Sequence, residues 1–256
     1  MTATIDLNAD LGESFGPWPM GDDDALLDIV TSANVACGFH AGDPLVMART
    51  VALCRDKGVG IGAHPGFDDL RGFGRRRILD PDPASLRAML IYQIGAIQGM
   101  ARAAGTSVRH VKLHGALSNM ASEDAVLARR CIDAIREADP TLVVMAMAAT
   151  PLESEALAAG APVAREVFAD RAYNDDGTLV ARGTAGAMIE DPDEAADRVL
   201  RMIDERALVS VNGKRIAIEP QTVCTHGDSP SAVAMAERLR TRLEQAGVRI
   251  AAFPAS

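Results

Sequence analysis

Ile5-Asp6-Leu7-Asn8-Ala9-Asp10 is the stretch that decides the fold class of this 256-residue chain. Apolar and polar side chains alternate along it, and successive side chains of a β-strand point to opposite faces. The three polar residues therefore share one face, whereas a parallel strand covered by helices is normally apolar on both. This pattern favours a strand whose polar face lines the interior or mouth of a barrel. A solvated edge strand, or Asp10 capping the following turn, is the alternative.

Four later stretches have the same layout, an apolar β-like run that ends in a cluster of polar residues. They are residues 34–40, 61–65, 110–115 and 222–228. Four of the five histidines of the chain end such runs. Parallel α/β folds carry their chemistry at the carboxyl ends of the strands. We therefore expect one polar site built from distant segments, which is typical of an enzyme subunit.

Strand-like and helix-like segments alternate along the whole chain. The expected strands are 4–10, 32–37, 59–64, 108–114, 141–148, 163–169, 222–226 and 248–253, and the expected helices are 22–31, 44–57, 83–104, 122–138, 151–159, 191–206 and 230–246. Such alternation predicts a mainly parallel sheet, either open and doubly wound or closed into a barrel. We favour an α/β fold of the irregular parallel β/α-barrel type with seven or eight strands, because a barrel brings every strand end to one rim.

The same barrel is expected to form a single domain over residues 1–256. No proline- or serine-rich linker and no break in composition divides the chain. Turn signals at residues 174–177 and at Asn212-Gly213 indicate small hairpin insertions on the barrel.

Composition excludes several classes of function. A net charge of −9 argues against a nucleic-acid partner, which normally needs a basic surface. The longest apolar run, residues 142–149, is far too short to span a bilayer. The four cysteines show no zinc-type spacing and are typical of reduced thiols. With a strand-like pattern from residue 4 in place of a signal peptide, these features predict a cytoplasmic protein that does not associate with membranes.

Two histidines follow the second and third expected strands, next to small or turn-forming residues. His40 and His64 would occupy equivalent positions at the rim, facing Asp10. One carboxylate and two imidazoles can form a general acid–base set or bind a divalent metal ion. Because the sequence has no compact H-x-x-x-H or H-x-H spacing, the metal stays an open possibility.

Lys112 and His114 project together from the fourth expected strand, because they are two residues apart. A lysine inside a barrel is costly unless it faces a carboxylate or an anionic ligand. Asp6, Asp10 or Glu13, or the carboxylate of a substrate, would serve. The alternative is a lysine at the solvated lip of the strand.

Further candidates lie in loops and at a helix start. His226 and Asp228 precede Ser229-Pro230, a typical helix N-terminus and hence a natural anion site, although capping alone explains part of this pattern. Arg75 lies in a glycine-rich loop that also carries several other arginines, and Asp170-Arg171 follows the sixth strand. Arginine-bearing loops can close over a carboxylate or phosphate, although charge runs are often only solvated surface. The sequence contains neither a G-x-x-x-x-G-K-[ST] loop nor a G-x-S-x-G elbow.

The chain resembles the LamB/YcsF family in six ordered blocks. They are residues 6–14, 32–44, 62–75, 112–117, 166–171 and 226–228. Leu113 and Ser118 depart from the proline and tyrosine that are common in the family. The resemblance implies a seven-stranded β/α barrel related to the glycoside hydrolase/deacetylase group. It also implies ATP-dependent opening of the 5-oxo-L-proline lactam to L-glutamate, by a 5-oxoprolinase in which this chain is the A component and subunits B and C are its partners.

The strand-end pattern and the resemblance together give a set of candidate site residues. The candidate catalytic residues are Asp10, Glu13, His40, His64, Lys112, His114 and His226, and the candidate substrate-binding residues are Asn8, Asn34, Arg75, Asp170, Arg171 and Asp228. Within this set, Asp10, His64 and His226 would transfer protons or activate water. Two rival hypotheses remain open, a stand-alone divalent-metal deacetylase or amidohydrolase, and a non-catalytic subunit that binds 5-oxoproline for its partners.

Overall fold

A closed ring of seven parallel strands forms the centre of the protein. The computed structural model describes residues 3–225 and 232–253. Its ring consists of β1 (Thr4–Leu11), β2 (Ser32–Ala36), β3 (Gly60–His64), β4 (Val108–Val111), β5 (Val143–Met147), β6 (Val163–Phe168) and β9 (Thr222–Thr225). Each strand pairs with its neighbour in this order, and β9 pairs with β1 to close the ring. The seven-stranded parallel barrel expected from the sequence is confirmed.

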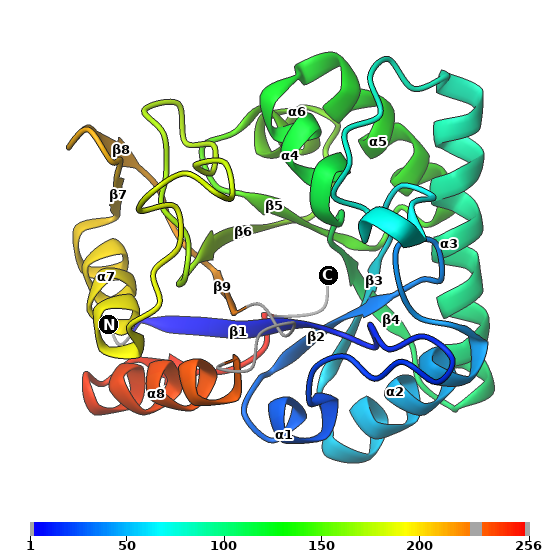
Figure 1. The fold of residues 1–256 in the computed structure, drawn as a ribbon, viewed down its shortest axis with the longest axis horizontal. Coiled ribbons are helices and arrows are strands. Elements are labelled where there is room, and N and C mark those ends of the chain that lie inside the picture. Colours follow the sequence, from blue (N-terminus) through cyan, green and yellow to red (C-terminus); the bar gives the residue numbers. More distant parts are fainter. Residues whose placement is uncertain (1–2, 226–231, 254–256) are drawn as a thin grey trace.

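Helices surround the strands on the outside of the barrel (Figure 1). They are α1 (Asp23–Leu27), α2 (Pro44–Lys57), α3 (Pro83–Ala103), α4 (Gly115–Glu123), α5 (Ala125–Ala138), α6 (Pro151–Ala158), α7 (Pro192–Glu205) and α8 (Ala232–Gln245), with a 3₁₀ turn, η1 (Leu70–Gly72). Aspartates start several of them; for example, the Asp43 carboxylate accepts from the backbone N–H groups of Leu45 and Val46. Within the described residues, no helix combines the length and apolar character needed to cross a membrane.

The two faces of β1 differ as its sequence predicts. Ile5 and Leu7 point outward and belong to an apolar cluster with residues of β9, α7 and α8. A second, larger cluster packs β2 and β3 against α2, α3 and α5. Asp6, Asn8 and Asp10 are also buried, but they bond to polar side chains of neighbouring strands inside the ring. The helices therefore bury the apolar face of the barrel, while its interior is polar.

The remaining short strands lie outside the ring. β10 (Arg249–Ile250) pairs only with Thr4 and Ile5 at the start of β1, so the expected eighth strand extends the sheet without entering the barrel. β7 (Ala207–Val209) and β8 (Arg215–Ala217) form the antiparallel hairpin predicted at Asn212-Gly213. The turn at residues 174–177 is also present, closed by a hydrogen bond from the Gly177 N–H to the Asn174 carbonyl oxygen.

One helix was not expected from the sequence. α4 begins directly after His114, and the helix expected at 122–138 is in fact α5, which Asp124 caps. The strand expected to reach residue 114 ends at Val111. The polar cluster after β4 therefore passes almost immediately into a helix, which places Lys112 and His114 in a short, tightly held connection.

Candidate active site

The interior of the barrel holds a ladder of polar side chains on β1, and Asp6 lies at its lower end. Its carboxylate accepts hydrogen bonds from the hydroxyl groups of Thr31, Ser32 and Thr222. Asp6 is 1% exposed, and burial raises the pKa of its carboxyl group although the three hydroxyl groups act in the opposite direction. With its oxygens bonded in this way, Asp6 supports the structure and lies away from the mouth.

One level higher, amide side chains and an imidazole bond across three strands. The Asn34 amide donates to Asn8 Oδ1 over 2.7 Å and to Asp10 Oδ1 over 2.9 Å, and Asn34 Oδ1 lies 2.8 Å from His110 Nε2. Gly62 separates Asn34 from His110 in the register, and a Cβ at this position would overlap the His110 ring. The glycine therefore makes room for an imidazole inside the barrel.

Lys112 is the charged centre of the interior. Its ammonium group lies 3.0 Å from Asp10 Oδ1 and 2.9 Å from Glu166 Oε1. It also donates to Cys224 Sγ over 3.0 Å. Burial alone would lower the pKa of Lys112, but Asp10, Cys224 and Glu166 outweigh it and hold the pKa well above its usual value. A lysine that stays cationic stabilises the buried carboxylate of Asp10.

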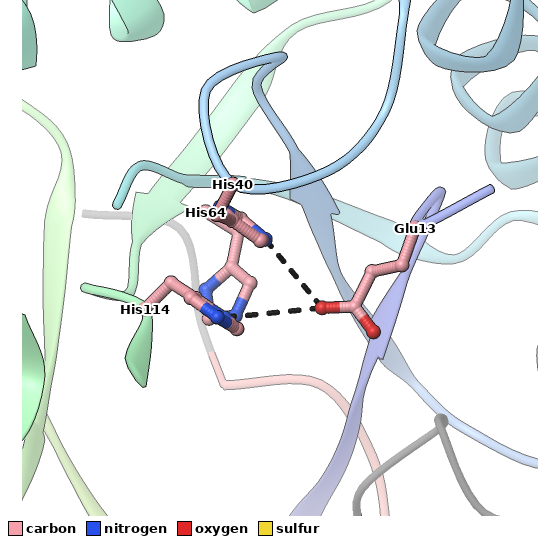
Figure 2. Close-up of side chains that lie close together, drawn as sticks. All are labelled: Glu13, His40, His64 and His114. Carbon is pink, nitrogen blue, oxygen red and sulfur yellow. Dashed lines mark hydrogen bonds and ion pairs between the residues drawn. The ribbon is translucent and has the colours of Figure 1, made fainter. Parts of the chain in front are cut away.

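Three histidines and one glutamate meet at the end of the barrel where the strands finish (Figure 2). His64 is the last residue of β3, Glu13 follows β1, His114 follows β4, and His40 lies in the loop after β2. Glu13 Oε1 lies 3.5 Å from His40 Nε2 and 3.8 Å from His114 Nδ1. His64 Nε2 lies 3.0 Å from His114 Nδ1 and 3.4 Å from Asp10 Oδ2. Residues more than a hundred positions apart thus share one cluster, which we call the His/Glu cluster.

Two glycines hold the imidazole rings of this cluster close together. The rings of His40 and His114 stack with centroids 3.6 Å apart and planes 4° from parallel. A Cβ at Gly74 would lie 2.7 Å from His114 Cδ2 and 2.8 Å from His40 Cβ, and one at Gly66 would lie 3.0 Å from His40 Nδ1. Gly74 also has a φ of +62°, which favours glycine. Larger residues at either position would push the rings apart.

Burial keeps two of these histidines neutral. Burial has the largest effect on the pKa of His114 and the neighbouring His64 the second largest, and this pKa is lowered to about 3. Desolvation followed by His114 and His64 also lowers the pKa of His40 well below its usual value. Their rings therefore present lone pairs at neutral pH. Four ligand atoms of the His/Glu cluster lie within 4.8 Å of one another, so this cluster has the composition and spacing to hold a metal ion.

A pocket of about 330 Å³ opens beside the cluster, at the lower end of the range for small-molecule sites. Asp10, Glu13, His64, Lys112 and His114 line it from the barrel. Four arginines complete the wall, namely Arg75, Arg77, Arg171 and Arg182. Residues 178–182, from the segment between β6 and α7, form part of the same wall.

The candidate residues from the sequence take different places around this pocket. Seven of them line it: Asp10, Glu13, His64, Lys112, His114, Arg75 and Arg171. Asn8 and Asn34 are fully buried below it and bond to Asp10 and Lys112 or to each other. His40 lies behind His114 in the stack, and Asp170 is buried beside Arg171. His226 and Asp228 lie outside the described residues.

Sequence reasoning missed two contacts of Lys112. Glu166 and Cys224 were absent from the candidate set, yet both touch the ammonium group. Their spacing contained a signal: Ala164, Glu166 and Phe168 alternate along β6, so one face of a buried strand carries a charge. Burial raises the pKa of Glu166 although Lys112 lowers it.

Fold and site together define a class of protein, a parallel β/α barrel with a polar, histidine-rich mouth. The fold is shared with a family 4 carbohydrate esterase from Streptomyces lividans, at a TM-score of 0.51 and 13% identity over 99% of this chain and 93% of that one. At this identity the likeness concerns the fold alone, and it confirms the expected deacetylase-like barrel architecture.

The chain belongs to the LamB/YcsF family, whose sequence profile matches residues 5–256. It is 55% identical over 249 residues to the 5-oxoprolinase A component of Ruegeria pomeroyi, covering 97% of this chain and 98% of that protein. A homologue of the same name from Rhodopseudomonas palustris is 53% identical and covers 98% of both. A crystal structure of the lactam utilization protein from Thermus thermophilus has a TM-score of 0.91 and 43% identity, covering 98% of this chain and 100% of that one.

Proposed function

We propose that this chain is the A component of an ATP-dependent 5-oxoprolinase, which opens 5-oxo-L-proline to L-glutamate together with partner subunits. The observation that carries the proposal is 53–55% identity to proteins named as this 5-oxoprolinase component, over nearly the whole of both chains. The pocket at the mouth of the barrel is the proposed place for the lactam. Subunits B and C are the proposed partners.

The charge of the pocket suits an anionic substrate. The chain carries a net charge of −9, yet the pocket wall has four arginines and Lys112 against the carboxylates of Asp10, Glu13 and Glu123. Arg77 is paired with Glu123 over 2.6 Å. A local excess of positive charge on an acidic protein attracts a small anion to this place. At neutral pH 5-oxoproline carries one carboxylate, and a phosphorylated form of it carries additional negative charge.

Arg171 is the residue that we propose for binding the substrate carboxylate. It is 3% exposed and lines the pocket, and its Nη2 donates to the Val180 carbonyl oxygen over 2.7 Å. Its Nε is buried without a hydrogen-bond partner among the described residues. Burial, together with the nearby Arg182, lowers the pKa of Arg171 to about 10, so the guanidinium is still charged at neutral pH. A buried cation with an unused donor is a good site for a carboxylate.

Asp10 is the residue that we propose as the general base. Lys112 and Asn34 both donate to its Oδ1, while its Oδ2 faces His64 and the His/Glu cluster. The ammonium group of Lys112 stabilises the negative charge of this carboxylate, which would accept a proton from an attacking water. A lactam is a weak electrophile, and transfer of a phosphoryl group from ATP to its oxygen would make the ring carbon easier to attack. Water would then add to that carbon, and the C–N bond would break as the ring nitrogen takes up a proton. A second water would release the phosphoryl group as inorganic phosphate and leave L-glutamate.

The experiment that tests this proposal measures L-glutamate formed from 5-oxo-L-proline by the purified chain with its partner subunits. Each protein and ATP are omitted in turn. We expect glutamate only when the chain, its partners and ATP are all present. ATP-independent hydrolysis by this chain alone would instead support the stand-alone amidohydrolase. Full turnover by the partners without this chain would refute a role in the reaction.

A further inference from the structure

Two histidines of the His/Glu cluster have their tautomers fixed by backbone carbonyl groups. His64 Nδ1 lies 2.8 Å from the carbonyl oxygen of Lys112, and His114 Nε2 lies 2.8 Å from that of Phe73. A carbonyl oxygen only accepts, so these two ring nitrogens carry the hydrogens. In the neutral rings, His64 Nε2 and His114 Nδ1 are therefore both lone-pair acceptors.

These two acceptors face each other across 3.0 Å. Two lone pairs at this distance repel unless a positive species lies between or beside them. A proton on either ring would satisfy this pair alone and would leave the other nearby donors unused. A metal ion would use both lone pairs at once. A ring N–H donated to a backbone carbonyl, with the other nitrogen on the metal, is the usual arrangement of histidine ligands.

His40 and Glu13 supply further donors at the same place. His40 is 1% exposed, and neither of its ring nitrogens has a hydrogen-bond partner in the described part of the chain. Its Nε2 points toward Glu13 Oε1, 3.5 Å away (Figure 2). A fully buried imidazole without a hydrogen bond at either nitrogen is costly, because the buried polar atoms have lost their hydrogen bonds to water. Coordination of one nitrogen to an ion would offset that cost.

The spacing of the donors fits a small divalent ion. Bonds of about 2.0–2.1 Å to a tetrahedral ion place neighbouring donors roughly 3.4 Å apart. The three neighbouring separations in the cluster are 3.0 Å for His64–His114, 3.5 Å for Glu13–His40 and 3.8 Å for Glu13–His114. Three imidazole nitrogens and one carboxylate suit Zn²⁺ and similar transition metals, whereas Mg²⁺ and Ca²⁺ prefer oxygen ligands.

We propose that Glu13, His40, His64 and His114 bind one divalent transition-metal ion of the Zn²⁺ class. The site adjoins both the pocket and the proposed base, because Glu13, His64 and His114 line the pocket and His64 Nε2 lies 3.4 Å from Asp10 Oδ2. An ion of this class supplies Lewis acidity to an oxygen that reaches it. The four donors lie after β1, after β2, at the end of β3 and after β4, so the ion would also tie these four strand ends together.

The test measures metal binding directly on the full-length chain. The protein is stripped with a chelator and titrated with ZnCl₂ in a calorimeter. The bound metal is counted by elemental analysis after desalting, and a Co²⁺-loaded sample is examined by visible absorption. The variants are Glu13→Gln and His114→Gln, with His110→Asn as the matched control, since His110 is buried in the same barrel but bonds to Asn34. Circular dichroism shows which variants are folded.

We expect one Zn²⁺ per wild-type chain, an absorption spectrum typical of Co²⁺ with nitrogen ligands, and a higher melting temperature with the ion bound. Affinity should fall in both cluster variants by more than the roughly 10- to 100-fold that loss of a hydrogen bond to a ligand costs, and stay unchanged in His110→Asn. Glu13→Gln, which preserves shape, decides the matter if His114→Gln does not fold. Wild-type protein without stoichiometric metal, or a folded Glu13→Gln variant that binds as tightly as wild type, would overturn the proposal. Wild-type protein that takes up no stoichiometric metal yet supports lactam opening with its partners would refute this site and leave the proposed function intact.

Discussion

Replacing Lys112 by methionine removes the only charge that touches both Asp10 and Glu166 in the described interior of the barrel. Methionine is also unbranched and fills much of the same space. Removing one partner of a buried ion pair costs about 3–5 kcal/mol, because the other partner is left as an uncompensated buried charge. At roughly 2–4 °C per kcal/mol for a chain of this size, the melting temperature should fall by about 6–20 °C.

The pH dependence gives this prediction a second signature. Burial already raises the pKa of Glu166, and without the lysine this pKa rises further, while Asp10 loses the cation beside it. An acid whose pKa is higher in the folded chain than in the unfolded chain stabilises the fold at pH values below the unfolded pKa. This stabilisation is lost as pH rises through the folded pKa. The loss of stability in Lys112→Met relative to wild type should therefore be larger at pH 8 than at pH 5. Adding Glu166→Gln to the variant should recover part of the loss, since it removes one of the two unpaired charges.

Thermal and urea unfolding of wild type, Lys112→Met and the double variant measure these differences. Arg87→Met is the matched control, because Arg87 pairs with Glu137 where both side chains are about half exposed, at 54% and 50%. Exposed ion pairs contribute little to stability, so this change should shift the melting temperature far less. Equal shifts in the two single variants, or no recovery in the double variant, would refute the buried-charge reasoning.

Two further predictions concern pH and the substrate. Burial is the largest cause that lowers the pKa of His110 from 6.5 to about 3, and the charge of Lys112 is the second. The neutral imidazole therefore contributes stability that is present above pH 6.5 and is lost as pH falls toward 3. Between pH 8 and pH 5, the free energy of unfolding in urea should fall by about 2 kcal/mol more for wild type than for His110→Asn, and equal losses would contradict a neutral buried imidazole. Arg171→Lys should raise the KM for 5-oxoproline about 10- to 100-fold, because a hydrogen bond to a charged group contributes about 1.5–3 kcal/mol. The change in kcat should be smaller. An unchanged KM in steady-state assays would show that Arg171 does not bind the carboxylate.

Much of the barrel was predictable because its signals are local. The alternation in β1 placed Asp6, Asn8 and Asp10 on one face, and the structure buries that face inside the ring. The positions of the strand ends then follow from the topology, because all parallel strands of a closed barrel finish at the same rim. That is why His64 and Lys112 could be expected near Asp10 from the sequence.

The remaining details depend on contacts that no local pattern encodes. α4 starts at Gly115 with a φ of +55° and contains serine and asparagine, which are weak helix formers, so tertiary packing decides its existence. The ammonium group of Lys112 contacts Glu166 and Cys224, which lie on strands far from it in the sequence. His40 lies four residues beyond the end of β2, in a loop where Gly38 and Gly42 have positive φ angles. This loop stacks the His40 ring on that of His114.

The most direct test of a catalytic site at the mouth of the barrel is glutamate formation by the reconstituted enzyme that carries Asp10→Asn. Asparagine preserves the shape of the side chain but cannot accept the proton, so turnover should fall by about 10²- to 10⁴-fold. Gel filtration checks that the complex still assembles, and Asp133→Asn, on the exposed side of α5, is the control with unchanged turnover. Wild-type turnover by an assembled Asp10→Asn complex would contradict the account.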